Sequence, residues 1–349
     1  MNAGLSSAKP KWISLQLVRG IAALAVVISH LPYWINAATC DEEIEKTFVV
    51  RMGGVAVFVF FCLSGIVISL AHEKELHLST VKKRSKFLPF WIKRFFRIYP
   101  VFWLLAAINL LFFSWGWATP DSFVSSLHSA TDLIKGFLLL STQTPLAPAW
   151  SLFHELLFYC VFSLFFFSRR LGFLAAGGWL GLTLLAAIGA LRDRPSLSLW
   201  HLYFLAGAIL VLLRFRIRLS PLQRRLCLAS FWMPLTFVAL YPGESLPAIG
   251  FGLTGVILLF LPLLEHRDMP ESTYNSPWQR FGSGLGDISY SLYLGHFPVQ
   301  TLLYHFMGPP GEIWKMALYV AAPITVALFL YKTLERPVTD YGRRLSGSF

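Results

Sequence analysis

Two polar residues interrupt the first long apolar run of the chain, ISLQLVRGIAALAVVISH. Arg19 and His30 are eleven positions apart, which at about 100° per residue places both on one helix face, roughly 16 Å apart along the axis. A guanidinium can hold phosphate or carboxylate groups, and an imidazole can act as a general base near neutral pH. Because a cation facing hydrocarbon is costly, this face is expected to line a protein interior or a wet cavity. The alternative is that Arg19 snorkels to the interface and His30 only packs.

A second polar stripe lies in the segment PAWSLFHELLFYCVF. Ser151, Glu155 and Tyr159 recur every four residues, so they share one face of an otherwise apolar helix. A carboxylate in such a helix needs a partner, and Arg19 or His30 is the obvious candidate. A structural ion pair is the alternative to a role in a site.

The most basic loop of the chain ends in FWIKRFFRIYP. Arg94 and Arg97 are three residues apart and are therefore neighbours at the mouth of the next apolar segment. Guanidinium groups suit phosphates because each offers a planar fork of donors. The alternative is that both arginines only anchor the topology.

Composition indicates a membrane protein. Hydrophobic residues make up 56% of the chain, charged residues 14%, and the mean hydropathy is +0.60. The net charge of +12 comes from basic residues in short loops between apolar segments, which fits membrane topology better than a nucleic-acid face. The four cysteines show no CxxC or Cys/His spacing, so neither a metal site nor a disulfide is expected.

The apolar runs predict an all-α, polytopic integral membrane protein with about ten transmembrane helices. With the N-terminus inside, 23 of the 30 Lys and Arg residues fall on the inner side and six on the outer side, with Arg19 inside a span. This asymmetry predicts that both termini are cytoplasmic and that the loop 41–46 is outside. The predicted spans are 13–35, 53–72, 98–117, 150–168, 171–191, 197–213, 226–241, 246–264, 286–307 and 314–333.

The segment 133–149, DLIKGFLLLSTQTPLAP, is apolar enough to compete with these spans. Counting it would invert everything downstream and place the basic C-terminus outside. Pro145 and Pro148 interrupt it, so it is expected to be a partial or re-entrant element. Residues 1–349 are interpreted as a single transmembrane domain with no appended soluble domain, whose first segment is a retained helix and not a signal peptide.

Several separated motifs resemble the acyltransferase 3 family of integral-membrane O-acyltransferases. The resemblance covers almost the whole chain, and six motifs in the same order carry it. These are Arg19-x10-His30, FFCLSG at 60–65, Arg94-x-x-Arg97 followed by IYP, WSLxxExxFY at 150–159, ISYSLYLxHFPV at 288–299, and Glu335-Arg336-Pro337.

The resemblance implies transfer of an acyl group, usually acetyl from acetyl-CoA, to a hydroxyl of a surface carbohydrate such as exopolysaccharide, O-antigen or a lipid-linked sugar. The expected location is the bacterial cytoplasmic (inner) membrane. The expected partners are membrane lipids, the carbohydrate acceptor and the polysaccharide assembly machinery, with no nucleic acid.

The residue types suit this reaction. His30 is the expected general base, oriented or charge-stabilised by Glu155, and Arg19 can stabilise the oxyanion. Arg94, Arg97 and Arg19 are expected to hold the anionic end of the donor. Direct transfer ranks above an acyl-enzyme because neither Ser64 nor Ser151 has an evident base. The remaining candidates for substrate or oxyanion contacts are Ser64, Trp150, Ser151, Tyr159, Tyr290 and His296.

Two other function classes stay open at this point. A secondary transporter of an anionic or lipid-linked solute would also use about ten spans and interior charges. It would predict inverted repeats with paired broken helices, which the sequence does not display. A structural subunit of a polysaccharide assembly complex would leave the Arg19 and His30 face unexplained. The acceptor sugar and the oligomeric state are left undecided by the sequence.

Overall fold

The computed structural model describes residues 12–35, 47–75, 78–117, 129–192, 194–241, 245–265 and 277–348, and every regular element in these ranges is helical. In chain order, the helices are α1 (Ile13–Ser29), α2 (Leu31–Ile35), α3 (Phe48–His72), α4 (Thr80–Arg84), α5 (Phe87–Ser114), α6 (Ala130–Phe137), α7 (Trp150–Ser163), α8 (Arg169–Ala187), α9 (His201–Leu213), α10 (Pro221–Ser230), α11 (Trp232–Leu240), α12 (Leu246–Glu265), α13 (Pro277–Met307), α14 (Ile313–Leu330) and α15 (Arg336–Gly347). The all-α prediction is confirmed.

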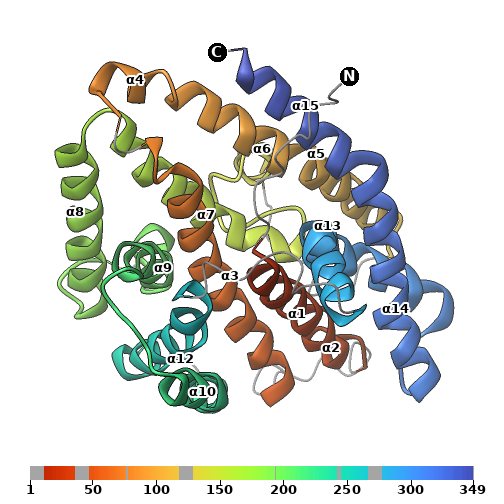
Figure 1. The fold of residues 1–349 in the computed structure, drawn as a ribbon. Helices are drawn as coiled ribbons and strands as arrows, with labels where there is room; N and C mark the ends of the chain where they lie inside the picture. The colour runs from red at the N-terminus through yellow and green to blue at the C-terminus, as the bar shows by residue number, and fades with distance from the viewer. Residues whose placement is uncertain are drawn as a thin grey trace, which may run out of the picture.

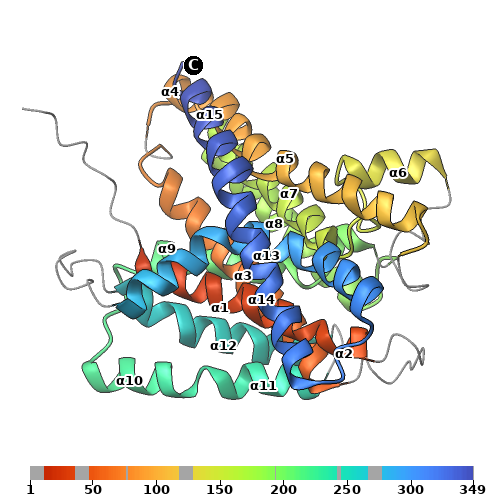
Figure 2. The ribbon, with the colours of Figure 1, turned by 90° about the vertical axis from the view of Figure 1, so that its right-hand side faces the viewer.

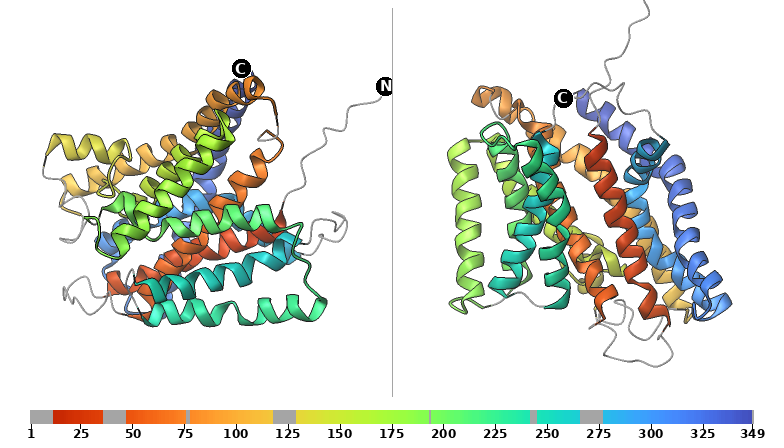
Figure 3. Two further views of the ribbon diagram at one scale, coloured as in Figure 1. Left: turned by 90° about the vertical axis from the view of Figure 1, so that its left-hand side faces the viewer. Right: turned by 60° about the horizontal axis from the view of Figure 1, so that its bottom comes forward.

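Helices α1, α3 and α13 form the centre of the bundle (Figure 1). Helix α1 packs against both α3 and α13, while α3 also packs against α9 and α13 against α14. Helices α8 and α10 to α12 lie on one side of this centre, and α14 with α15 on the other (Figures 1 and 3). Helix α15 continues α14 through a π-helical turn, Tyr331–Glu335, and packs along α5.

Glycines allow helices α3 and α9 to cross at very short range. A Cβ atom at Gly65 of α3 would lie 2.1 Å from the carbonyl oxygen of Phe204, and one at Gly207 of α9 would lie 2.1 Å from that of Cys62. Helices in lipid gain little from hydrophobic association with each other, so small residues that permit close backbone packing stabilise such crossings. This crossing fixes α3, which carries Ser64, against the rest of the bundle.

Eight helical segments in the described part of the chain are long and apolar enough to cross a membrane, so the protein is a multi-pass membrane protein. Two of the ten predicted spans, 226–241 and 286–307, are not among these eight. The first begins earlier, at Pro221 after a capping box of Ser220 and Gln223, and is divided at Phe231 between α10 and α11. Pro234 has no N–H to donate to the carbonyl oxygen of Ser230, which favours a break at this point. The second lies in α13, whose polar side chains are buried in the protein interior, among them Ser289, Ser291, His296 and Gln300.

The basic stretch before the third predicted span is helical in its second half. Helix α5 begins at Phe87, so Lys93, Arg94 and Arg97 belong to the helix and not to a loop. The prediction that a loop extends to the end of this basic stretch is therefore wrong. Lys and Arg are good helix formers, so a basic stretch does not by itself end a helix.

The segment 133–149 is a partial element, as the sequence predicts. Helix α6 is only eight residues long and is followed by irregular chain up to a 3-10 turn at Ala147–Ala149. Side chains of the neighbouring α5 satisfy the freed carbonyl groups: Tyr99 donates to Leu138, Trp103 to Phe137 and Asn109 to Pro145, at 2.9–3.0 Å. Figure 2 shows α6 lying alongside α5. Broken backbone is tolerated in a membrane protein where protein groups pair with it in this way.

Candidate active site

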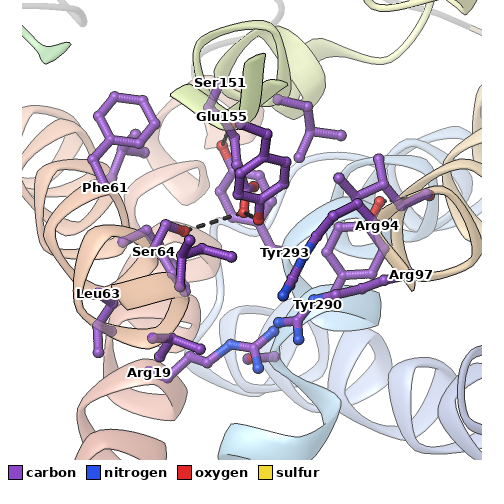
Figure 4. Close-up of a pocket in the computed structure, with 18 of the residues that line it drawn as sticks. Arg19, Phe61, Leu63, Ser64, Arg94, Arg97, Ser151, Glu155, Tyr290 and Tyr293 are labelled. Carbon is purple, nitrogen blue, oxygen red and sulfur yellow. Dashed lines mark hydrogen bonds between the residues drawn. The ribbon is translucent and has the colours of Figure 1, made fainter. Parts of the chain in front are cut away.

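A cavity of about 160 Å³ opens between α1, α3, α5, α7 and α13. Figure 4 shows its polar lining, to which each of these five helices contributes. Eight of the predicted site residues line it: Arg19, Ser64, Arg94, Arg97, Ser151, Glu155, Tyr159 and Tyr290. The sequence therefore identified a group of residues that the fold does bring together.

Three guanidinium groups gather in this cavity, which we call the arginine cavity. Arg19 comes from α1, and Arg94 and Arg97 come from α5; Figure 4 shows their ends pointing toward one another. Arg94 is 9% exposed, and its Cζ lies 5.4 Å from the ring centroid of Tyr159. Among the described residues, its Nε has no hydrogen-bond partner although it is buried. Like charges held this close in a concave site favour an anionic ligand.

Two carboxylates face the three cations. Glu155 accepts a hydrogen bond from Ser64 Oγ at 3.1 Å and another from the hydroxyl of Tyr159. Glu335, on the π-helical turn after α14, accepts from both the backbone N and the Oγ of Ser291, at 3.3 and 2.6 Å. Its carboxylate interacts electrostatically with Arg19 and Arg97. Three guanidinium groups and two carboxylates together carry a net positive charge.

Sequence reasoning assigned no role in the site to Glu335. This residue entered only as part of the motif Glu335-Arg336-Pro337. A carboxylate close to an apolar segment signals a buried partner, but its neighbours Ser291 and Arg19 lie 44 and 316 positions away along the chain. Spacing could not link them.

The cavity reaches Tyr293 on α13. The Tyr293 hydroxyl donates to the carbonyl oxygen of Pro148 at 2.8 Å and lies 2.8 Å from Ser151 Oγ. Its ring also contacts that of Phe60, with centroids 5.6 Å apart. His296 follows Tyr293 by three residues, about 4.5 Å further along the helix axis. The lined part of the cavity thus ends about one helical turn before His296.

His30 and His296 form a second polar group, which we call the histidine pair. Their ring centroids are 4.7 Å apart, with an edge-to-face inclination of 63°. His30 Nδ1 lies 2.8 Å from the carbonyl oxygen of Val26, and His296 Nδ1 lies 3.2 Å from that of Leu292. Neither histidine is among the described residues that line the arginine cavity. Trp150 is also outside that lining and packs against Trp200, with ring centroids 4.9 Å apart.

Two details of the predicted chemistry need correction. Glu155 does not orient His30: it accepts from Ser64 and Tyr159, whereas His30 Nδ1 bonds to its own helix. The physical reason is depth, because Glu155 packs at the level of Arg19, three turns before His30. The premise that Ser64 lacks a base is also wrong, since its hydroxyl donates to the Glu155 carboxylate.

Comparison with known proteins identifies the family of the chain. The family model for the acyltransferase domain called Acyl_transf_3 matches residues 12–332. Protein 2 in the picA locus of Rhizobium radiobacter is 29% identical over 174 residues, which cover 44% of this chain and 81% of that protein. Acyltransferase MdmB of Streptomyces mycarofaciens is 30% identical over 185 residues, which cover 47% of this chain and 43% of that protein. No solved structure matches. The chain is a multi-pass membrane protein that belongs to the acyltransferase 3 family of acyltransferases.

Proposed function

We propose that the protein transfers an acetyl group from acetyl-CoA to a hydroxyl of a surface carbohydrate. One observation supports this most strongly: three guanidinium groups converge in a cavity at the level of Arg19, and His30 lies three turns further along the same helix. Coenzyme A has matching polarity, because its phosphates are at one end of a long thin arm and its thioester is at the other. Phosphates are good ligands for grouped arginines.

The reaction assigned to the two ends is direct acyl transfer. The arginine cavity holds the phosphates, and the arm extends past Tyr293 toward the histidine pair. His30 Nε2 takes the proton of the acceptor hydroxyl as its oxygen attacks the thioester carbonyl carbon. The carbon–sulfur bond then breaks, and the coenzyme A thiolate leaves and receives the proton. The bond of His30 Nδ1 to the Val26 carbonyl supports this role because it leaves the Nε2 lone pair free.

The same proposal includes a topology with ten crossings and both termini in the cytoplasm of a bacterial inner membrane. It rests on the excess of Lys and Arg on one side. The start of α1 and the end of α15 lie at the same end of the bundle in the right-hand view of Figure 3. This orientation opens the arginine cavity toward cytoplasmic acetyl-CoA and places His30 on the side of the exported acceptor. The loop 41–46, predicted to be outside, falls beyond the described residues.

Cysteine labelling tests the orientation. In a cysteine-free background, a cysteine at position 192 is expected to react with an impermeant maleimide from outside, and one at position 216 only after permeabilisation. The opposite pattern would overturn the orientation.

An acetyl-transfer assay tests the function itself. Purified protein in nanodiscs is supplied with acetyl-CoA labelled in the acetyl group, and with membranes of the native host lacking the protein as the source of acceptor. We expect thiol release that depends on the membranes and label that enters carbohydrate as base-labile ester. Thiol release without carbohydrate labelling would reject the acceptor class, and the absence of both would reject acetyl-CoA as the donor.

A further inference from the structure

His296 contains a buried polar atom that the resting protein leaves without a hydrogen bond. The side chain is fully buried, and its Nδ1 lies 3.2 Å from the Leu292 carbonyl oxygen. A carbonyl can only accept, so Nδ1 carries the proton and Nε2 of the neutral ring is a bare acceptor. In the described part of the chain, Nε2 has no partner. Buried acceptors are normally satisfied, so this one calls for an explanation.

Other polar side chains near His296 on α13 already have hydrogen-bond partners. Gln300 accepts from Trp34 Nε1 at 2.9 Å and donates to the carbonyl oxygen of Tyr319 at 3.1 Å. Thr301 donates to the carbonyl oxygen of Phe297 at 3.0 Å. The unsatisfied nitrogen is therefore specific to His296 and does not reflect a generally loose polar core at this level of α13.

His30 is in the same protonation state by the same argument. Its Nδ1 bonds to the Val26 carbonyl, so its Nε2 is also a bare acceptor. The two rings touch, with centroids 4.7 Å apart. Neither ring carries a proton on Nε2, so one added proton would give the pair a donor beside a bare acceptor.

We propose that His296 is the positioning residue that shares the proton His30 removes from the acceptor hydroxyl, an inference that rests on the proposed function. When His30 Nε2 takes this proton, its new N–H donates to His296 Nε2 and the imidazolium is stabilised. The proton then passes from His30 to the coenzyme A thiolate as the carbon–sulfur bond breaks, and both rings return to their starting state. Atoms and charges balance without another reactant.

Two isosteric substitutions separate this role from packing. Asparagine can keep the bond of Nδ1 to the Leu292 carbonyl but has no group where Nε2 lies, whereas glutamine places its amide group there. We expect His296→Asn to lower kcat about 10–100-fold, the range for partners that orient a reacting group, with KM for acetyl-CoA unchanged. We expect His296→Gln to stay within about fivefold of the parent, since its amide oxygen accepts the shared proton's hydrogen bond. Thr301→Val, which removes a neighbouring buried hydroxyl on the same helix, serves as the matched control.

The solvent deuterium isotope effect on the transfer step gives a second readout. The parent is expected to show a proton inventory that requires two exchangeable sites, and His296→Asn one that requires a single site. Equal activity of the two His296 variants, whether both high or both low, would overturn the proposal, as would an unchanged inventory. Full transfer by His30→Ala would contradict the role of His30 as the general base in the proposed function. This result is independent of the His296 variants.

Discussion

The arginine cavity and the histidine pair lie about three turns apart along α1. Their polar atoms differ in how far they are satisfied by hydrogen bonds. In and beside the arginine cavity, Ser64, Tyr159 and Ser291 donate to the two carboxylates, and the cations remain in excess. In the histidine pair, each ring is tied to its own helix by Nδ1, and the other nitrogens are left bare. The first region suits an anionic ligand, and in the proposed function the second accepts a proton.

Under the proposed function, this difference corresponds to a separation of donor binding from chemistry along α1. An enzyme that places both at one level would need the whole donor and the whole acceptor in one pocket. Here the volume of about 160 Å³ belongs to the arginine cavity alone. The donor arm has to bridge roughly 16 Å from Arg19 to His30.

The largest effect is expected at the histidine end. His30→Ala should lower acetyl transfer about 10²–10⁴-fold, the usual contribution of a general base. The measurement is initial-rate label transfer to host membranes with the variant in nanodiscs. His30 is half-buried at the end of α1, so the variant should still fold, which size-exclusion chromatography checks. Transfer within threefold of the parent would remove His30 from the chemistry.

A smaller and different effect is expected at the arginine end. Arg94→Ala or Arg97→Ala should raise KM for acetyl-CoA about 10–100-fold, because a hydrogen bond to a charged group contributes about 1.5–3 kcal/mol, while kcat changes little. Arg336→Ala is the matched control, since this arginine is 67% exposed in its side chain and does not line the cavity. A loss in kcat with unchanged KM would instead place the arginines in the transfer step.

The smallest effect is expected at Ser64. Direct transfer uses this hydroxyl only to satisfy Glu155, so Ser64→Ala should lower kcat/KM about fivefold, equivalent to one ordinary hydrogen bond. Abolished transfer would argue for an acyl-enzyme with Glu155 as the base, and a quenched reaction would then show one acetyl group on the parent protein by intact mass.

Part of this site was predictable from local spacing. Ser151, Glu155 and Tyr159 line the cavity because a period of four residues places them on one face of α7. Arg94 and Arg97 share it because they are three apart on α5. In these cases the sequence pattern and the contact belong to the same helix.

Relations between helices were not predictable in this way. Spacing predicts the face of a helix but not its depth relative to another helix, so Glu155 was paired with His30 and not with Ser64. The same limit hid Glu335, which interacts electrostatically with Arg19 and Arg97 from the far end of the chain. The start of α10 at Pro221 depends on a cap at Ser220, which an apolar run alone does not reveal. Helix α13 is not among the eight helices that are apolar enough to cross a membrane, because it carries many polar side chains. Several of these are buried against protein.

Equilibrium binding of acetyl-CoA to three samples tests the central claim most directly. Isothermal titration in nanodiscs would compare the parent, His30→Ala, and the double variant Arg94→Ala/Arg97→Ala, without acceptor, so that no transfer occurs. Separation of binding from chemistry predicts that His30→Ala keeps the parent Kd within about threefold, while the double variant binds at least about 30-fold more weakly. Unchanged affinity in the folded double variant, or loss of donor binding in His30→Ala, would contradict the account.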